Sequence, residues 1–149
     1  MPKQTAEHAS YDRDYHAWLT ESAALLREGC LSEVDLAQIA EELEDMGKSE
    51  RRAIESYLKV LIVHLLKWQH QPERRGPSWQ LSIANSRDAI GRRLRESPSL
   101  RPKLPEMVAE RYPNARQHAA LEMGLDLGDL PDTCPFTVAQ LLDEGYRGE

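Results

Sequence analysis

The chain has 149 residues, of which 40% are hydrophobic and 6% aromatic, and its formal net charge at pH 7 is −6. A chain of this length can bury its own core, so folding requires neither disulfides nor a structural metal. No apolar run approaches the roughly 20 residues that cross a bilayer, and residues 1–10 have no signal-peptide features. We expect one domain over residues 1–149, located in the cytoplasm, with residues 1–10 as a flexible N-terminal tail.

Charge is distributed unevenly along the chain. Residues 1–50 carry a net −8, residues 51–103 a net +8 and residues 104–149 a net −6. A basic middle segment could bind nucleic acid. The pI near 5.4 favours the alternative that acidic helices lie beside a basic one in a single bundle.

The predicted elements in the first half of the chain are three helices. Residues 11–28 have apolar side chains at helical spacing, and Gly29 is well placed to end this helix. A second helix follows a capping-box-like segment at residues 32–35 and ends at Gly47. Its apolar positions are Leu36, Ile39, Leu43 and Met46. A third, capped by Ser49 and ended by Pro72, is apolar over more than half its circumference, so we expect it to be the central helix.

The second half of the chain predicts one more long helix and several shorter ones. Ser78 is a plausible cap for a helix that ends before Ser97. A fifth helix begins at Leu104, and Pro113 either kinks it or starts a sixth. Residues 135–143 form a short closing helix. The predicted fold class is therefore all-α: an antiparallel helical bundle of about four long helices with additional short C-terminal helices.

Arg87 interrupts the apolar stripe of the helix that follows Ser78. A guanidinium that faces a core must be paired, because an isolated buried charge costs several kcal/mol. The second predicted helix is acidic and offers carboxylates, so we expect Arg87 to pair with Glu42, or otherwise with Glu41. This pair would join the acidic first segment to the basic middle one.

His64 lies at the edge of the apolar face of the central helix, one turn before Trp68. A lone histidine there is more often a core residue than a ligand. Together with the glutamates and Arg87, however, it would have the ingredients of an acid–base or metal site. The candidate polar cluster comprises Glu41, Glu42, Glu44, His64, Trp68 and Arg87.

Established metal motifs are missing from the sequence. No glutamate has a histidine three residues later, as di-iron bundles require, and no His-Glu-x-x-His is present. A site from His16, His64 and His118 is arithmetically possible but unsupported by spacing. Cys30 and Cys134 lack partners at metal-ligand spacing, so we expect buried or idle thiols. We expect no cofactor.

Single-stranded nucleic acid could stack on Trp79 and be clamped by two arginine pairs, at residues 74–75 and 92–93. The simpler interpretation, which we favour, places Trp79 in the core stripe and the arginines on a solvated rim.

Several stretches of the chain resemble one bacterial family, number twenty-nine in the series of domains of unknown function. They are residues 11–19, 36–44, 64–69, 78–79, 97–100 and 130–137. The resemblance implies a compact helical bacterial protein with no established activity, and it transfers no catalytic residue. The family pattern includes the six residues of the polar cluster.

Three functions remain open from the sequence. The first is a non-enzymatic interaction or regulatory module that binds another bacterial protein. The second is a small enzyme or a ligand- or metal-binding bundle that uses the Glu–His–Arg cluster. The third is nucleic-acid binding through the basic middle segment.

Overall fold

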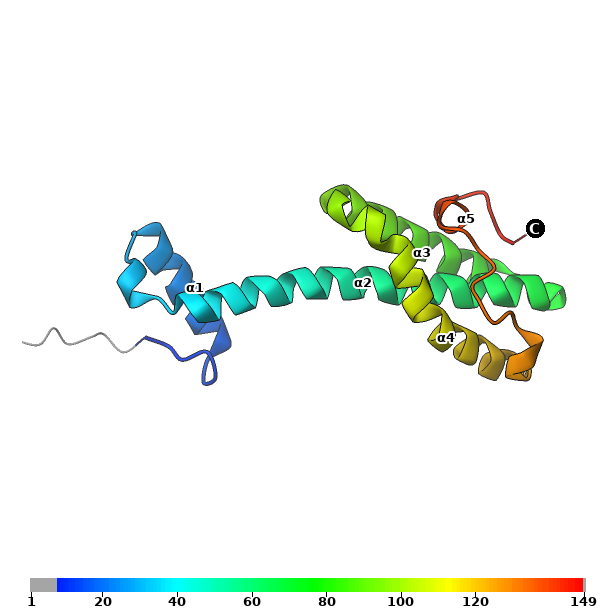
Figure 1. The fold of residues 1–149 in the computed structure, drawn as a ribbon, viewed down its shortest axis with the longest axis horizontal. Coiled ribbons are helices and arrows are strands. Elements are labelled where there is room, and N and C mark those ends of the chain that lie inside the picture. The colour runs from blue at the N-terminus through cyan, green and yellow to red at the C-terminus, as the bar shows by residue number, and fades with distance from the viewer. Residues whose placement is uncertain (1–7, 149) are drawn as a thin grey trace, which may run out of the picture. The chain divides into compact units, whose positions relative to one another are not determined.

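The computed structural model describes residues 8–148, and all regular structure in that range is helical (Figure 1). The all-α prediction is confirmed. Internal contacts divide the chain into two compact units, Met1–Gly47 and Lys48–Glu149. One helix runs through both units, and a single domain stays a prediction. In the described range, no helix combines the length and apolar content needed to cross a membrane.

The first unit contains α1 (Tyr15–Arg27), a 3₁₀ turn (Leu31–Glu33) and the start of α2 (Leu36–His70). The helix-ending role of Gly29 is confirmed: its φ of 75° is the left-handed conformation, and Cys30 N donates to Leu25 O across the helix end. The cap of α2 is Asp35, whose Oδ1 accepts from Gln38 N at 3.0 Å. The predicted capping box that begins at residue 32 is therefore wrong, because a 3₁₀ turn occupies that position.

Helix α2 is one continuous helix of 35 residues, and the predicted break at Gly47 is wrong. Gly47 does not adopt the positive φ that ends α1 at Gly29. Glycine inside a helix costs only about 1 kcal/mol relative to alanine, which the flanking turns of α2 outweigh. Ser49 lies in the helix interior and caps nothing.

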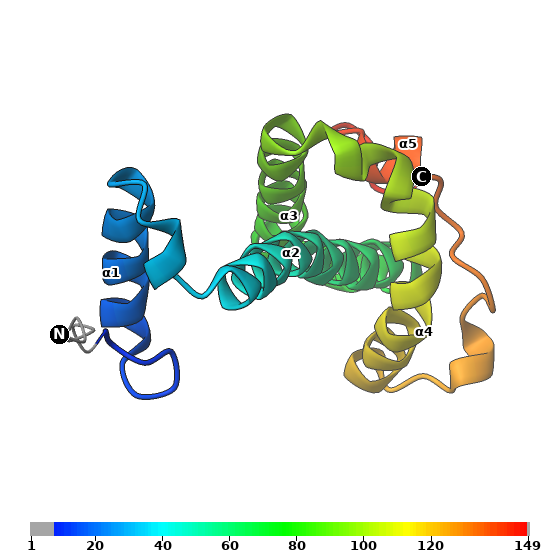
Figure 2. The same ribbon diagram turned by 60° about the vertical axis from the view of Figure 1, so that its left-hand side comes forward.

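The second unit packs α3 (Pro77–Glu96), α4 (Leu104–Met123) and α5 (Val138–Leu142) around the second half of α2. Figures 1 and 2 show α3 and α4 on different sides of this part of α2. Helix α5 contacts both α3 and α4. The predicted central helix is confirmed, since its apolar residues are almost fully buried. These residues are Ile54, Leu58, Leu61, Ile62, Leu65 and Leu66.

Two helix starts in this unit differ from the predictions. Helix α3 begins at Pro77 with Gly76 before it, so Ser78 is not its cap. Helix α4 continues through Pro113, and no sixth helix starts there. Proline removes the donor to the carbonyl four residues earlier, at Ala109. Because Ala109 and Pro113 are both exposed, water can hydrate that carbonyl.

Candidate functional site

Arg87 is buried, as predicted, with 6% of its surface exposed. Its guanidinium donates to carbonyl oxygens at the end of α5: Nε to Leu141 O at 2.8 Å and Nη2 to Gln140 O at 3.2 Å. A third, longer bond joins Nη1 to Glu144 O at 3.4 Å. Burial lowers the pKa of Arg87, and the charge of Asp143 opposes that shift.

The predicted partners of Arg87, Glu42 and Glu41, are therefore wrong. Helical periodicity shows that Arg87 faces inward, but it does not show which element covers it. The carbonyls at a helix end have no intrahelical donor, and they carry partial negative charge. They take the role that the sequence suggested for a carboxylate.

Glu42 has tyrosine partners within the first unit. Tyr11 Oη donates to Glu42 Oε2 at 3.2 Å, and Tyr15 Oη donates to Glu42 Oε1. Burial raises the pKa of Tyr11, and the hydrogen bond to Glu42 raises it further. Glu41 and Glu44 are exposed on α2. Two of the family-like stretches, residues 11–19 and 36–44, thus contact each other through Glu42.

His64 and Trp68 lie in the second unit with different partners. His64 is half-buried and its Nδ1 donates to Val60 O at 2.7 Å, which leaves Nε2 as the available ring nitrogen. Trp68 is buried, and the guanidinium groups of Arg75 and Arg147 lie over its ring at 5.2 and 5.5 Å. A combined Glu–His–Arg site stays a prediction.

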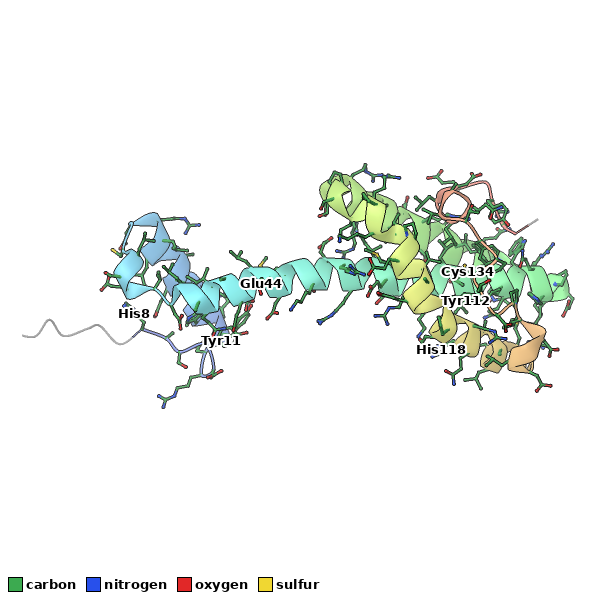
Figure 3. All side chains as sticks on the ribbon, in the orientation of Figure 1. His8, Tyr11, Glu44, Tyr112, His118 and Cys134 are labelled. Carbon is green, nitrogen blue, oxygen red and sulfur yellow. The ribbon has the colours of Figure 1, made fainter. Side chains whose placement is uncertain are left out.

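Next to His64, α2 and α4 carry a group of charged side chains. Lys67 Nζ lies 2.8 Å from Glu122 Oε2 and 4.9 Å from the centre of the Trp79 ring. Lys67 is the main cause of a lowered pKa at Glu122, and His64 and His118 add to it. Figure 3 labels His118 on α4. In the described part of the chain, no three His, Cys, Asp or Glu side chains are placed to hold a metal ion.

The buried carboxylate in the second unit is Glu55, which the sequence analysis missed. Only 6% of its side chain is exposed, and it pairs with Arg51 at 3.2 Å and with Arg111 of α4 at 3.0 Å. Arg51 also lies near Glu106 and Glu110. The signal available in the sequence was the position of Glu55 beside Ile54 and Leu58 on the apolar face.

Several basic residues of the middle segment are engaged within the chain. Arg93 Nη1 pairs with Glu50 at 2.8 Å, and Lys67 pairs with Glu122 and covers Trp79. Arg75 Nε donates to Trp68 O at 2.7 Å. These pairings favour the arrangement of basic beside acidic helices, and nucleic-acid binding stays a prediction.

The two cysteines are free thiols and half-buried. Burial raises the pKa of Cys134, and Figure 3 shows it near Tyr112 in the second unit. Cys134 and Tyr112 line an apolar pocket together with Phe136 and Val138. Burial is also the largest cause that raises the pKa of Tyr112, to about 12, and its hydroxyl donates to Pro131 O.

The first half of α2 presents a stripe of apolar side chains that are exposed in the described part of the chain. Leu36, Leu43 and Met46 are 54%, 64% and 62% exposed, at positions where a bundle helix would bury its side chains. The acidic residues of the same segment flank the stripe. They are Glu41, Glu42, Glu44 and Asp45. We call residues 36–46 the acidic apolar stripe.

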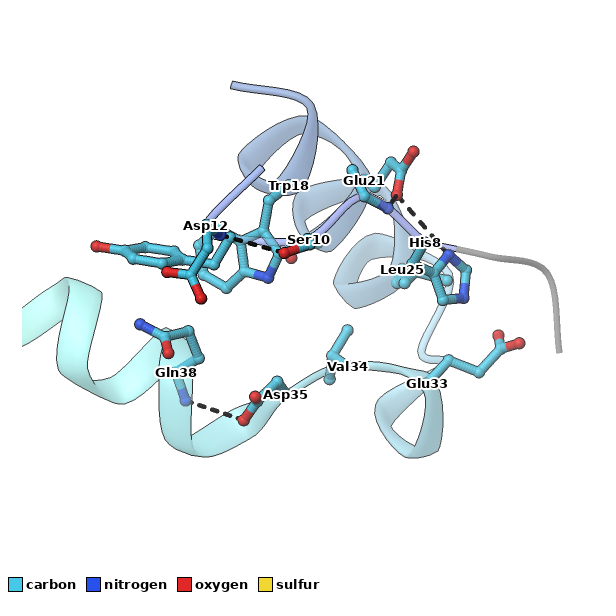
Figure 4. Close-up of a pocket in the computed structure, with 13 residues that line it drawn as sticks. His8, Ser10, Asp12, Trp18, Glu21, Leu25, Glu33, Val34, Asp35 and Gln38 are labelled. Carbon is cyan, nitrogen blue, oxygen red and sulfur yellow. Dashed lines mark hydrogen bonds and ion pairs between the residues drawn. The ribbon is translucent and has the colours of Figure 1, made fainter. Parts of the chain in front are cut away.

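A pocket of about 340 Å³ lies elsewhere in the first unit, between α1 and the start of α2 (Figure 4). Its aromatic lining residues are Tyr11 and Trp18, and its acidic ones are Asp12, Glu21, Glu33 and Asp35. His8 faces one of them, with Nδ1 at 3.8 Å from Glu21 Oε2.

These features define an all-helical protein whose first unit carries an acidic apolar surface and an acidic pocket. The chain belongs to the family described as Domain of unknown function DUF29, whose model matches residues 10–147. Neither a curated protein nor a solved structure matches the chain.

Proposed function

We propose that this protein is a non-enzymatic interaction module whose acidic apolar stripe binds a basic amphipathic helix of another bacterial protein, in the cytoplasm. The exposure of Leu36, Leu43 and Met46 carries the proposal. Together with Ile39 they repeat at intervals of three and four residues, the spacing of a seam that packs against a second helix.

Charge selects the kind of partner. Residues 1–50 carry a net −8. A second copy of the stripe would place like charges along the seam, whereas a helix with lysine or arginine beside its apolar face would complement them. Each apolar side chain that passes from water into the seam contributes about 1.5–3 kcal/mol when fully buried.

Binding can be tested with a fluorescent helical peptide of about 21 residues, with leucine at the seam positions and lysine beside them. We expect binding that weakens with salt and that the double substitution Leu43→Ser with Met46→Ser reduces by about tenfold or more. Fluorescence anisotropy measures both effects. The same peptide with glutamate in place of lysine is expected to bind more weakly.

A matched control is Leu121→Ser, because Leu121 is 74% exposed on α4, outside the stripe. It should leave the affinity unchanged. Equal affinity of the native protein and the stripe variant for the lysine peptide would refute the proposal, as would an equal loss with Leu121→Ser.

A further inference from the structure

The pocket of the first unit has a chemistry distinct from that of the acidic apolar stripe. It combines carboxylates with an aromatic wall in a volume of about 340 Å³, within the range of small-molecule sites. We propose that this pocket binds an organic cation of the guanidinium or alkylammonium class that also offers a hydrogen-bond acceptor.

Negative charge in the pocket is largely uncompensated. Within residues 8–148, no lysine or arginine forms an ion pair with Asp12, Glu33 or Asp35. Glu21 has two partners, His8 Nδ1 at 3.8 Å and Ala9 N at 2.6 Å. Carboxylates gathered around a concave wall attract a cation more strongly than the same charges spread over a convex surface.

A second, independent feature is the indole N–H of Trp18. Trp18 is only 8% exposed, its ring contacts the rings of Tyr11 and Tyr15, and its backbone N–H donates to Asp14 O. No hydrogen bond joins its indole N–H to another described residue, and Figure 4 shows the ring on the pocket wall with this nitrogen turned towards the space of the pocket. A largely buried tryptophan normally finds a partner for this donor.

The two features together define the ligand. The carboxylates require a group that donates hydrogen bonds and carries positive charge, which excludes anions and apolar molecules. The indole N–H can donate to an acceptor next to the cation, such as the carbonyl of an amide. An arginine or lysine residue in a peptide satisfies both conditions, as does a small free cation that carries a carbonyl.

The experiment uses N-acetyl-L-argininamide as the probe and the neutral N-acetyl-L-citrullinamide as its near-isostere. The readout is the indole N–H signal of Trp18 in heteronuclear NMR spectra of the full chain, assigned from Trp18→Phe. We expect a saturable shift of this signal with the arginine probe and at least about tenfold weaker binding of the citrulline probe.

Variants locate the effect in the pocket. Asp35→Asn preserves the cap of α2, because asparagine caps helices as well as aspartate does, while it removes one charge. Combined with Asp12→Asn, it should weaken the arginine probe about tenfold. Glu28→Gln, at an exposed position of the first unit outside the pocket lining, is the matched control and should change the affinity less than about twofold.

A longer probe distinguishes the sources of the cation. An acetylated and amidated Ala-Ala-Arg-Ala-Ala peptide that binds much more tightly than the arginine probe would identify a side chain of a partner protein. Equal binding of the two probes would identify a free small cation. The proposal fails if neither probe shifts the Trp18 signal, if the citrulline probe binds equally, or if Glu28→Gln weakens binding as much as the pocket variants. None of these outcomes bears on the acidic apolar stripe, because its exposed apolar residues Leu36, Leu43 and Met46 do not line the pocket.

Discussion

Replacing Arg87 with alanine is expected to release the C-terminal segment from α3. The substitution leaves three carbonyl oxygens without their donor, at Gln140, Leu141 and Glu144. A hydrogen bond to a charged group contributes about 1.5–3 kcal/mol, but removal of the buried charge also recovers part of its desolvation cost. We therefore expect the free energy of unfolding to fall by about 2–4 kcal/mol. Urea unfolding measures this loss, and amide hydrogen exchange should quicken over residues 138–147.

Two further variants show whether the donors are responsible. Arg87→Met retains the apolar stem without the guanidinium and should lose nearly as much stability as alanine. Arg92→Ala, at an exposed position of the same helix, should change the free energy of unfolding by less than about 0.5 kcal/mol. If Arg87→Ala unfolds at the urea concentration of the native protein and exchange at residues 138–147 is unchanged, the assigned role of Arg87 is refuted.

Three other predictions concern single positions. Gly47→Ala should stabilise α2 by about 0.5–1 kcal/mol in thermal unfolding, because a Cβ there meets no atom within 4 Å; a loss would contradict the continuous helix. Glu55→Gln should lower the free energy of unfolding in urea by about 1–3 kcal/mol, since it weakens ion pairs to Arg51 and Arg111; no change would show that the two arginines are adequately solvated without it. The raised pKa of Tyr112, about 12, means that the folded state retains this proton while the unfolded state loses it. Stability is therefore fully present below the unfolded pKa of 10.0 and should fall as the pH rises from there towards 12, with a weaker fall in Tyr112→Phe if the account is correct.

The helices of the second unit could be predicted because their apolar residues repeat at the helical period. Residues such as Leu58, Leu61 and Leu65 fall on one broad face, and burial of that face determines the core. The helix end predicted at Gly47 was wrong, because a single glycine carries little information about where a helix ends. A glycine is a weak stop signal when neither a left-handed φ nor a following proline accompanies it.

The candidate site could be predicted only in part. Periodicity correctly places Arg87 inside the protein, but the carbonyls that bind it belong to a helix end 53–57 residues further along the chain. Periodicity also gives Leu43 and Met46 an apolar face without showing whether another element covers it. The contact of Tyr11 and Tyr15 with Glu42 joins segments about 30 residues apart, a distance over which sequence spacing carries no information.

The most direct test of the proposed interaction is amide hydrogen exchange of the full chain with and without the lysine-flanked helical peptide. If the acidic apolar stripe is the binding surface, exchange slows over residues 36–47 when the peptide is present, and this protection disappears in the variant that combines Leu43→Ser with Met46→Ser. Protection confined to residues 77–123 would contradict the proposal, because it would place the peptide on α3 or α4.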